Sequence, residues 1–308
     1  MTLRQGSPEW LDARRSLVTG TDIPVLLGLS PYRCEADLAD EKLGGPSQES
    51  TLRMRIGSAL QGLIGEEYER QTGRKVREHH GMRINKKLPW AAASLDFVVV
   101  GERRIVEAKQ TSSRSRFADG IPQDVEAQVA WQLGVTGYPV ADIAVMTSDD
   151  LTVYEQPADP ALFADLVAVA EDFRRRLADG GPFARDADRI KRDYPADDGS
   201  EIEADHELRE AVAALVSLRA SRKRMEEDEA QIEAAIKARM ADAAVLRGPG
   251  WHVTWKRTKD REETDWKNLA HGILSTLPET ERTALVGLNT TVRAGFRPFR
   301  VVVEKETE

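Results

Sequence analysis

Residues 94–109 read SLDFVVVGERRIVEAK, and this stretch decides the fold. Its apolar runs at 98–100 and 105–106 consist of β-branched residues, which favour strands. Between them lies Gly101-Glu102, a dipeptide typical of a hairpin turn. The stretch therefore predicts two neighbouring strands joined by a tight turn.

Three charged residues frame this predicted hairpin. Side chains two positions apart on a strand point to the same face, so Glu107 and Lys109 should project together. The turn would bring Asp96 alongside them. Two carboxylates and an amine at one place can hold Mg²⁺ and activate water, as phosphodiester cleavage requires. The same residues also fit a hairpin with solvated charges on its outer face.

The whole chain has 308 residues, enough for one large domain or a catalytic domain with an appendage. Charged residues make up 31% and apolar residues 41%, which is typical of a globular protein. Asp and Glu total 52 against 44 Lys and Arg, giving a net charge of −8. Because phosphate contacts need basic side chains, any nucleic-acid surface must be a local groove.

Cysteine and histidine usage excludes two classes of site. Cys34 is the only cysteine, which rules out an internal disulfide and a cysteine-based zinc centre. The five histidines show no metal-ligand spacing. No apolar run approaches the length of a membrane span, and the N-terminus lacks a charged-then-apolar signal. We therefore expect a cytoplasmic protein with no membrane partner.

The first 182 residues alternate between helical and strand patterns. Their order predicts an α/β (α+β) fold in which a mixed central sheet is flanked by helices. The expected elements are short helices over 8–45, an amphipathic helix over 51–72, strands near 75–84, 91–100 and 104–110, a loop over 111–121, a helix over 122–137, a strand over 141–146 and a helix over 160–177.

The composition changes in the last third of the chain. We expect a linker over 183–200, a helical segment over 201–245 and a small α+β module over 246–308 that ends in a strand at 299–303. Apolar residues recur every seven positions in the helical segment, as in a coiled coil. Two charged residues interrupt that seam, which favours a helical hairpin over a long dimeric coil. The seam consists of Leu218, Met225 and Ile232, and the interruptions are Arg222 and Glu229.

The order of short motifs in the first 180 residues resembles the phage-type YqaJ/lambda exonuclease family of the PD-(D/E)XK nuclease superfamily. The resemblance implies a restriction-endonuclease-like core. The motifs that carry it are Glu9-Trp10-Leu11-x-x-Arg14, Val18-Thr19-Gly20-Thr21-Asp22, Gly28-Leu29-Ser30-Pro31-Tyr32, Gly57-x-x-Leu60, Ser94-x-Asp96, Glu107-x-Lys109 and Ala127-Gln128-Val129.

The resemblance implies a role for each matched position at the site. Asp96 and Glu107, with the backbone carbonyl of Ala108, resemble the Mg²⁺ ligands, and Mn²⁺ is expected to substitute. Lys109 resembles the lysine that positions the attacking water and stabilises charge on the phosphate. Gln128 falls where the family's helix-borne glutamine reaches the site, and Gln132 shares its helix face.

Further positions are implied for the nucleic acid. Arg14, Thr21 and Ser94 fall where the family builds a pocket for a terminal 5′-phosphate, and an arginine flanked by hydroxyls suits a phosphate. In the loop at 111–121, Arg114 and Arg116 are candidates for gripping DNA.

One position departs from the family pattern. The family places a glutamate four residues after the glycine that matches Gly57, and this chain has Gln61 there. A glutamine keeps the carbonyl oxygen and loses the charge, so it would bind Mg²⁺ more weakly.

The resemblance implies a Mg²⁺-dependent exonuclease of phage or prophage recombination, which would act in the cytoplasm of the host cell. It would degrade linear double-stranded DNA from the 5′ end and leave a 3′ single strand for an annealing protein. A ring-like homo-oligomer is also implied. The alternatives are a related nuclease of other polarity, an endonuclease, and a DNA-binding protein that has lost catalysis.

Overall fold

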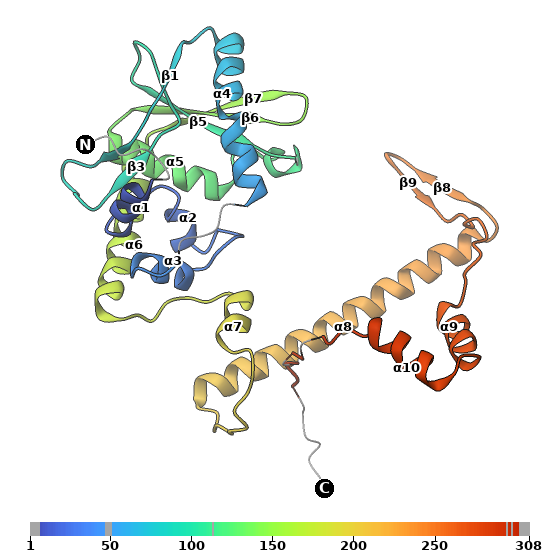
Figure 1. The fold of residues 1–308 in the computed structure, drawn as a ribbon. Helices are drawn as coiled ribbons and strands as arrows, with labels where there is room; N and C mark the ends of the chain where they lie inside the picture. Colours follow the sequence, from blue (N-terminus) through green and yellow to red (C-terminus); the bar gives the residue numbers. More distant parts are fainter. Residues whose placement is uncertain (1–6, 47–50, 113, 294, 297, 302–308) are drawn as a thin grey trace. The chain divides into compact units, whose positions relative to one another are not determined.

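The structure is a computed structural model that describes residues 7–46, 51–112, 114–293, 295–296 and 298–301 (Figure 1). The chain divides into two compact units, Met1–Tyr194 and Pro195–Glu308. No helix in the described ranges combines the length and apolar character needed to cross a membrane.

A five-stranded mixed sheet organises the first unit, in the order β1-β4-β5-β6-β7. The only parallel pair in this order is β5 with β6, and the other neighbours are antiparallel. The strands are β1 (Val76–Glu78), β4 (Phe97–Val99), β5 (Arg104–Gln110), β6 (Val140–Met146) and β7 (Leu151–Pro157). The mixed central sheet expected from the sequence is confirmed, and β7 is an addition to it.

The predicted hairpin is confirmed by the pairing of β4 with β5. Phe97 lies opposite Val106 and Val98 lies opposite Ile105. The connecting turn contains Gly101 at a φ of 81°, a left-handed conformation that glycine adopts without strain. The turn therefore returns the chain along the sheet as the sequence indicates.

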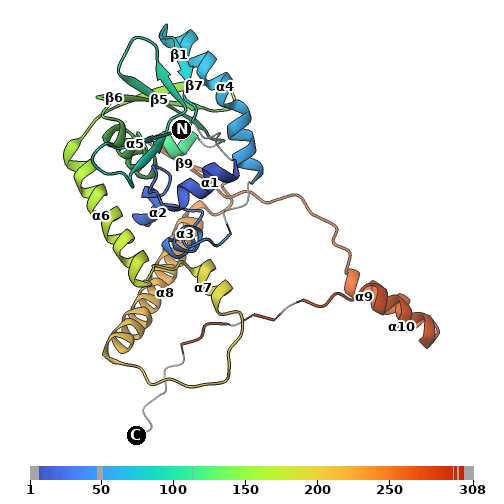
Figure 2. The same cartoon turned by 60° about the vertical axis from the view of Figure 1, so that its left-hand side comes forward.

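Helices cover both faces of the sheet, and Figure 2 shows α4 and α6 on opposite sides of it. On one face, α4 (Leu52–Thr72) packs Ile64 and Tyr68 against Val106. On the other, α5 (Gln123–Thr136) and α6 (Pro160–Asp179) pack around Ile105. Because alternate side chains of a strand face opposite ways, the odd-numbered residues of β5 point toward α5.

Two expected strands are each divided in the structure. The regions 75–84 and 91–100 contain β1 with β2 (Met82–Ile84), and β3 (Ala92–Ser94) with β4. The strands β2 and β3 form a separate two-stranded sheet. The chain changes sheets at Asp96, whose backbone carbonyl accepts from the N–H of His79. Gly81, at a φ of 98°, turns the chain between β1 and β2.

Short helices complete the first unit. They are α1 (Pro8–Arg15), α2 (Ile23–Leu26), α3 (Glu35–Lys42), the 3-10 helix η1 (Arg114–Phe117) and α7 (Ala187–Asp193). The segment at 183–200, expected as a linker, contains α7, and the unit boundary lies after residue 194. Ion pairs from Arg189 to Asp37 and Asp40 of α3 hold α7 in the first unit.

The second unit contradicts the expected helical hairpin at 201–245. A single helix, α8 (His206–Met240), runs for 35 residues. The physical reason is that no glycine or proline lies within it to form a turn. It is followed by the antiparallel pair β8 (Val245–Gly248) and β9 (Trp251–Thr254), then by α9 (Trp266–Ser275) and α10 (Glu279–Leu288).

The expected α+β module at 246–308 has strands and helices but no buried core among its described residues. Residues 299–301, expected to begin a last strand, are irregular, and residues 302–303 lie outside the described ranges. The seam on α8 therefore does not pack in a helical hairpin.

Candidate active site

The candidate site is built on β5, whose alternation directs Glu107 and Lys109 toward α5. Lys109 Nζ lies 2.7 Å from Glu107 Oε1 and donates to it. The Glu107 side chain is buried, with 5% of the residue exposed. A buried carboxylate is costly without such a partner, so the pair holds both side chains in place.

Asp96 joins this pair from the start of β4. Its Oδ2 accepts the backbone N–H of Ala108 at 2.8 Å, which fixes the carboxylate beside β5. Burial, and then the neighbouring charge of Glu107, raise the pKa of Asp96 to about 7, against the opposing effects of the Ala108 N–H and Lys109. Two neighbouring carboxylates repel each other when both are ionised, so a bound cation would stabilise the pair.

Lys109 stays charged in this environment. Burial lowers the pKa of Lys109, but the Glu107 carboxylate, its hydrogen bond, and the charges of Asp96 and Asp124 outweigh that effect and raise it overall. The ammonium is therefore a fixed positive charge beside two acidic groups.

Two glutamines on α5 hold Glu107 from the opposite side. Gln128 Nε2 donates to Glu107 Oε1 at 2.7 Å, and Gln128 Oε1 accepts from Lys109 Nζ at 2.9 Å. One turn later, Gln132 Nε2 donates to Glu107 Oε2 at 2.8 Å and to the Ser94 carbonyl at 3.1 Å. Both oxygens of Glu107 are thus oriented by donors from the same helix.

Comparison with known proteins identifies the segment that carries these residues. Residues 9–139 match the sequence pattern of the YqaJ-like viral recombinase domain. This segment is similar to the YqaJ-like domain.

The similarity to a known protein extends beyond the YqaJ-like domain. The chain is 26% identical over 263 residues to the YqaJ protein of Bacillus subtilis, covering 80% of this chain and 82% of that protein.

Solved structures share the fold of the YqaJ-like domain. LHK-Exo in complex with dAMP is 22% identical, with a TM-score of 0.50, covering 61% of this chain and 97% of that one. Another structure of LHK-Exo, titled an alkaline exonuclease from Laribacter hongkongensis, is 22% identical with a TM-score of 0.49, covering 56% and 94%.

Gly20 links the N-terminal part of the YqaJ-like domain to the α5 glutamines. A Cβ atom at this position would lie 3.2 Å from the Gln128 carbonyl oxygen and 3.4 Å from Cγ of both Gln128 and Gln132. A side chain would press on the residues that orient Glu107. Sequence reasoning placed Gly20 in a motif but did not assign it this role, for which its position between two threonines was the available signal.

The expected phosphate pocket of the YqaJ-like domain contains Arg14 and Thr21 in direct contact. Arg14 Nη2 donates to Thr21 Oγ1 at 3.0 Å and to Thr19 Oγ1 at 3.2 Å. The Arg14 guanidinium also lies 4.9 Å from the centre of the Trp10 ring. The guanidinium is thus held in one orientation beside two hydroxyl groups.

A buried aspartate, which sequence reasoning did not assign to the site, anchors this pocket. Asp22 Oδ1 accepts from Arg14 at 3.2 Å and from Arg33 at 3.1 Å, and Oδ2 accepts from Lys42 Nζ at 2.8 Å. Burial raises the pKa of Asp22, but Lys42, Arg14 and Arg33 outweigh it and hold the pKa well below its usual range. Asp22 stays ionised and fixes the three cations.

Ser94 lies on the glutamine side of the site. Its carbonyl accepts from Gln132, whereas Ser94 Oγ and Gln132 Oε1 are buried without a hydrogen-bond partner in the described part of the chain. Buried polar atoms are rarely left unpaired, so these two oxygens indicate that the site is shaped for a further polar group.

The remaining predicted residues are Gln61, Arg114 and Arg116. Gln61 is half-buried on α4, which covers the opposite face of the sheet, and among the described residues it has no hydrogen bond to Asp96 or Glu107. Arg116 forms an ion pair with Asp124 in the first turn of α5. The side chain of Arg114, in η1, lies outside the part of the chain that the structure describes.

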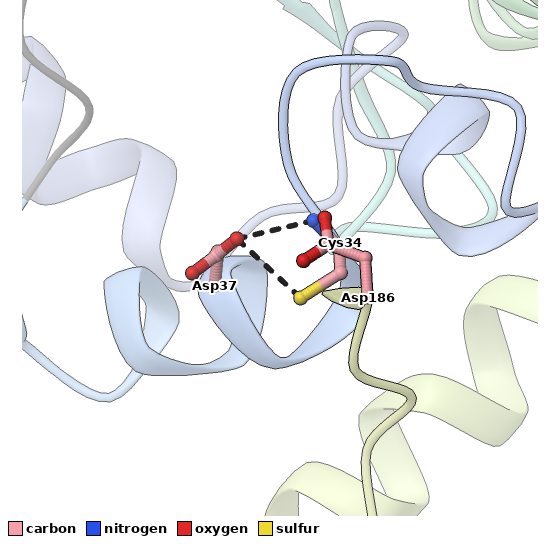
Figure 3. Close-up of side chains that lie close together, drawn as sticks. All are labelled: Cys34, Asp37 and Asp186. Atoms are coloured by element: carbon pink, nitrogen blue, oxygen red, sulfur yellow. Dashed lines mark hydrogen bonds between the residues drawn. The ribbon is translucent and has the colours of Figure 1, made fainter. Parts of the chain in front are cut away.

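A second group of potential metal ligands lies between α3 and α7. Ligand atoms of Cys34, Asp37 and Asp186 fall within 4.8 Å of one another (Figure 3). Asp37 Oδ2 accepts from Cys34 N and Sγ, at 3.1 and 3.4 Å, and Asp186 Oδ1 accepts the N–H of Arg189 at 2.7 Å. These bonds cap the two helices, which accounts for the cluster without a metal.

The donor set at β5 fits Mg²⁺. This ion prefers oxygen ligands and is commonly held by one or two carboxylates while it keeps several waters. Asp96 and Glu107 supply two carboxylates, and burial together with the charge of Glu107 raises the pKa of Asp96, so a bound cation would stabilise the ionised pair.

Proposed function

We propose that this chain is a Mg²⁺-dependent DNA exonuclease that degrades linear double-stranded DNA from the 5′ end. It would leave a 3′ single strand for an annealing protein. The observation that carries the proposal is the convergence of Asp96, Glu107 and Lys109 within one hydrogen-bonded group. The match of residues 9–139 to the YqaJ-like viral recombinase domain supports the proposal, as does the similarity to the alkaline exonuclease LHK-Exo.

The carboxylates and lysine divide the chemistry between them. Asp96 and Glu107 would hold the cation, for which Mn²⁺ should substitute. When bound, a divalent ion supplies Lewis acidity that lowers the pKa of a water and neutralises charge at the scissile phosphate. Lys109, kept protonated by its acidic neighbours, is positioned to donate to a phosphate oxygen and stabilise the charge that develops there.

The glutamines have a positioning role in this proposal. Gln128 contacts both Glu107 and Lys109. It therefore fixes the spacing between a proposed ligand of the cation, Glu107, and a proposed donor to the phosphate, Lys109. Gln132 holds the other oxygen of Glu107. Outer partners of this kind commonly set metal affinity and activity.

The end specificity is proposed to come from Arg14 and Thr21. Their guanidinium and hydroxyl groups suit a terminal 5′-phosphate, and Gly20 packs the same loop directly on the α5 glutamines. This packing supports a route by which a bound 5′ end reaches Glu107. A ring-like homo-oligomer around the duplex belongs to the same proposal.

The test uses linear duplex DNA labelled at either end and carrying a 5′-phosphate or a 5′-hydroxyl. Release is followed in Mg²⁺, in Mn²⁺ and in EDTA, with Lys109→Ala as the inactive variant and Lys75→Ala, an exposed lysine paired with Glu69, as the matched control. We expect metal-dependent release from the 5′ end, faster with the phosphate, lost in Lys109→Ala and kept in Lys75→Ala.

Other results would redirect the assignment. Metal-dependent cleavage without end preference would keep the Asp96–Glu107 site and reject the 5′ pocket, as an endonuclease requires. DNA binding with no cleavage in any metal would reject the enzyme. Such a result would favour a DNA-binding protein in which Gln61, in place of a glutamate, reflects lost catalysis.

A further inference from the structure

The long helix α8 carries an apolar face that the described residues of its own unit leave uncovered. Leu218, Met225 and Ile232 are 67%, 70% and 62% exposed. They line one shallow groove together with Leu215 and several charged residues of the same helix. Apolar residues at a seven-residue interval normally face a partner helix, so this face is a docking surface for another helix.

The charges beside the apolar face are separated by sign along the helix. Residues 219–224 read RASRKR, with four basic and no acidic side chains, and residues 226–233 read EEDEAQIE, with five acidic and no basic side chains. Met225 lies between the two segments. The face is therefore positive on one side of its midpoint and negative on the other.

This charge pattern selects the partner and its direction. We propose that α8 pairs antiparallel with α8 of a second copy of this chain. In an antiparallel pair that crosses at Met225, the basic segment of each copy lies along the acidic segment of the other, and Leu218 of one copy faces Ile232 of the other. The apolar residues then meet across the two-fold axis, as an isologous interface requires.

The opposite direction is disfavoured by the two residues that interrupt the seam. A parallel pair in register would place Arg222 against its own equivalent, and Glu229 against its own equivalent, in a seam that excludes water. Like charges so placed repel each other. In the antiparallel pair, Arg222 lies opposite Asp228 of the second copy and next to its Glu229, so the interruptions specify the orientation.

Two interactions within the unit compete with this pairing and are exposed. Arg222 forms an ion pair with Glu226 of the same helix at 3.3 Å, and its side chain is 75% exposed. The Arg219 guanidinium lies 5.8 Å from the Phe299 ring centre. Exposed contacts of this kind contribute little, so they do not hold the face against a second helix.

The first experiment measures the mass of the full chain over a range of concentrations. We expect self-association that Arg219→Glu/Arg222→Glu weakens at least tenfold and Glu226→Arg/Glu229→Arg weakens likewise. An equimolar mixture of the two variants should associate again, because the reversed charges of one variant then face reversed charges of opposite sign on the other. Arg209→Glu, an exposed change on α8 outside both segments, is the control.

The mixture separates a lost interface from a damaged fold. If the first unit forms its own oligomer, each charge reversal should halve the assembly mass and the mixture should restore it. A monomer at every concentration, or an unchanged assembly in both variants, would overturn the proposal. Failure of the variants to re-associate when mixed would also overturn it.

A distance measurement tests the direction of pairing. A spin label at Glu210→Cys in a Cys34→Ser background reports the separation between equivalent positions. With a rise of 1.5 Å per residue, the antiparallel pair gives roughly 45 Å between the two labels, whereas a parallel pair gives about 10 Å. A short distance would reject the proposed orientation. Nuclease activity of the charge-reversal variants is measured separately and does not decide this test.

Discussion

Replacing Asp96 by asparagine should stabilise the metal-free protein at neutral pH. The pKa of Asp96 is raised to about 7 from the 3.8 of an unperturbed aspartate. Each pKa unit corresponds to about 1.4 kcal/mol, so ionising this group in the fold costs about 4 kcal/mol at most. Because the side chain is half-buried, solvent screening reduces the expected gain to about 2 kcal/mol.

The sign of the pH dependence follows from the raised pKa. The folded state holds its proton more tightly than the unfolded state, so this contribution to stability is fully present below about pH 4. It is lost as the pH rises through about 7. Asparagine does not ionise and can still accept from the Ala108 N–H, so the difference between variant and parent should grow over this window and level off above it.

Thermal unfolding in EDTA from pH 4 to pH 8 measures the effect. For a domain of this size, 2 kcal/mol corresponds to a rise in Tm of roughly 4–8 °C. Asp165→Asn, at an exposed position on α6, is the matched control. Added Mg²⁺ should stabilise the parent and not Asp96→Asn, since a ligand stabilises only a state that binds it. A Tm for Asp96→Asn at pH 8 equal to or below that of the parent would refute the reasoning.

Three further substitutions probe separate parts of the domain. Asp22→Asn leaves Arg14, Arg33 and the buried Lys42 without their shared anion. The free energy of unfolding, measured with urea, should fall by about 3 kcal/mol, as expected for a broken buried ion pair. A decrease below about 0.5 kcal/mol would contradict the proposed network. Gly65→Ala places a Cβ 2.8 Å from Phe97 Cζ and should cost about 1–3 kcal/mol by the same measurement, whereas Gly62→Ala, with open space around it, should cost nothing. Gln132→Ala should lower kcat about 10–100-fold and weaken Mg²⁺ stabilisation without loss of DNA binding, and an unchanged kcat would remove Gln132 from the positioning role.

Local patterns in the sequence were sufficient for the hairpin. The strands flanking Gly101 are short, apolar and separated by a turn, so their pairing depends on neighbours within about ten residues. The two-residue alternation then determines that Glu107 and Lys109 share a face, whatever the rest of the fold does. This is why the centre of the candidate site could be derived before the sheet order was known.

Contacts between distant loops could not be derived in this way. Asp22 lies in a short motif of the sequence, but its partners Arg33 and Lys42 are 11 and 20 positions away. They come close to Asp22 only through the turns before α3 and the packing of α3 itself. The hairpin expected over 201–245 failed for a different reason. Charged residues in the seam were interpreted as a break in the helix, although charge ends a coiled-coil seam without ending the helix itself.

The geometry at Gly20 couples the proposed 5′-phosphate pocket to the residues around Glu107. Its neighbours Thr19 and Thr21 contact Arg14, while the glycine itself contacts Gln128 and Gln132. A shift of this loop therefore moves the groups that orient Glu107 as well as those proposed to hold the 5′-phosphate. The sequence alone does not show that these two sets of residues lie together. They are about one hundred positions apart and come into contact only when α5 packs against the loop.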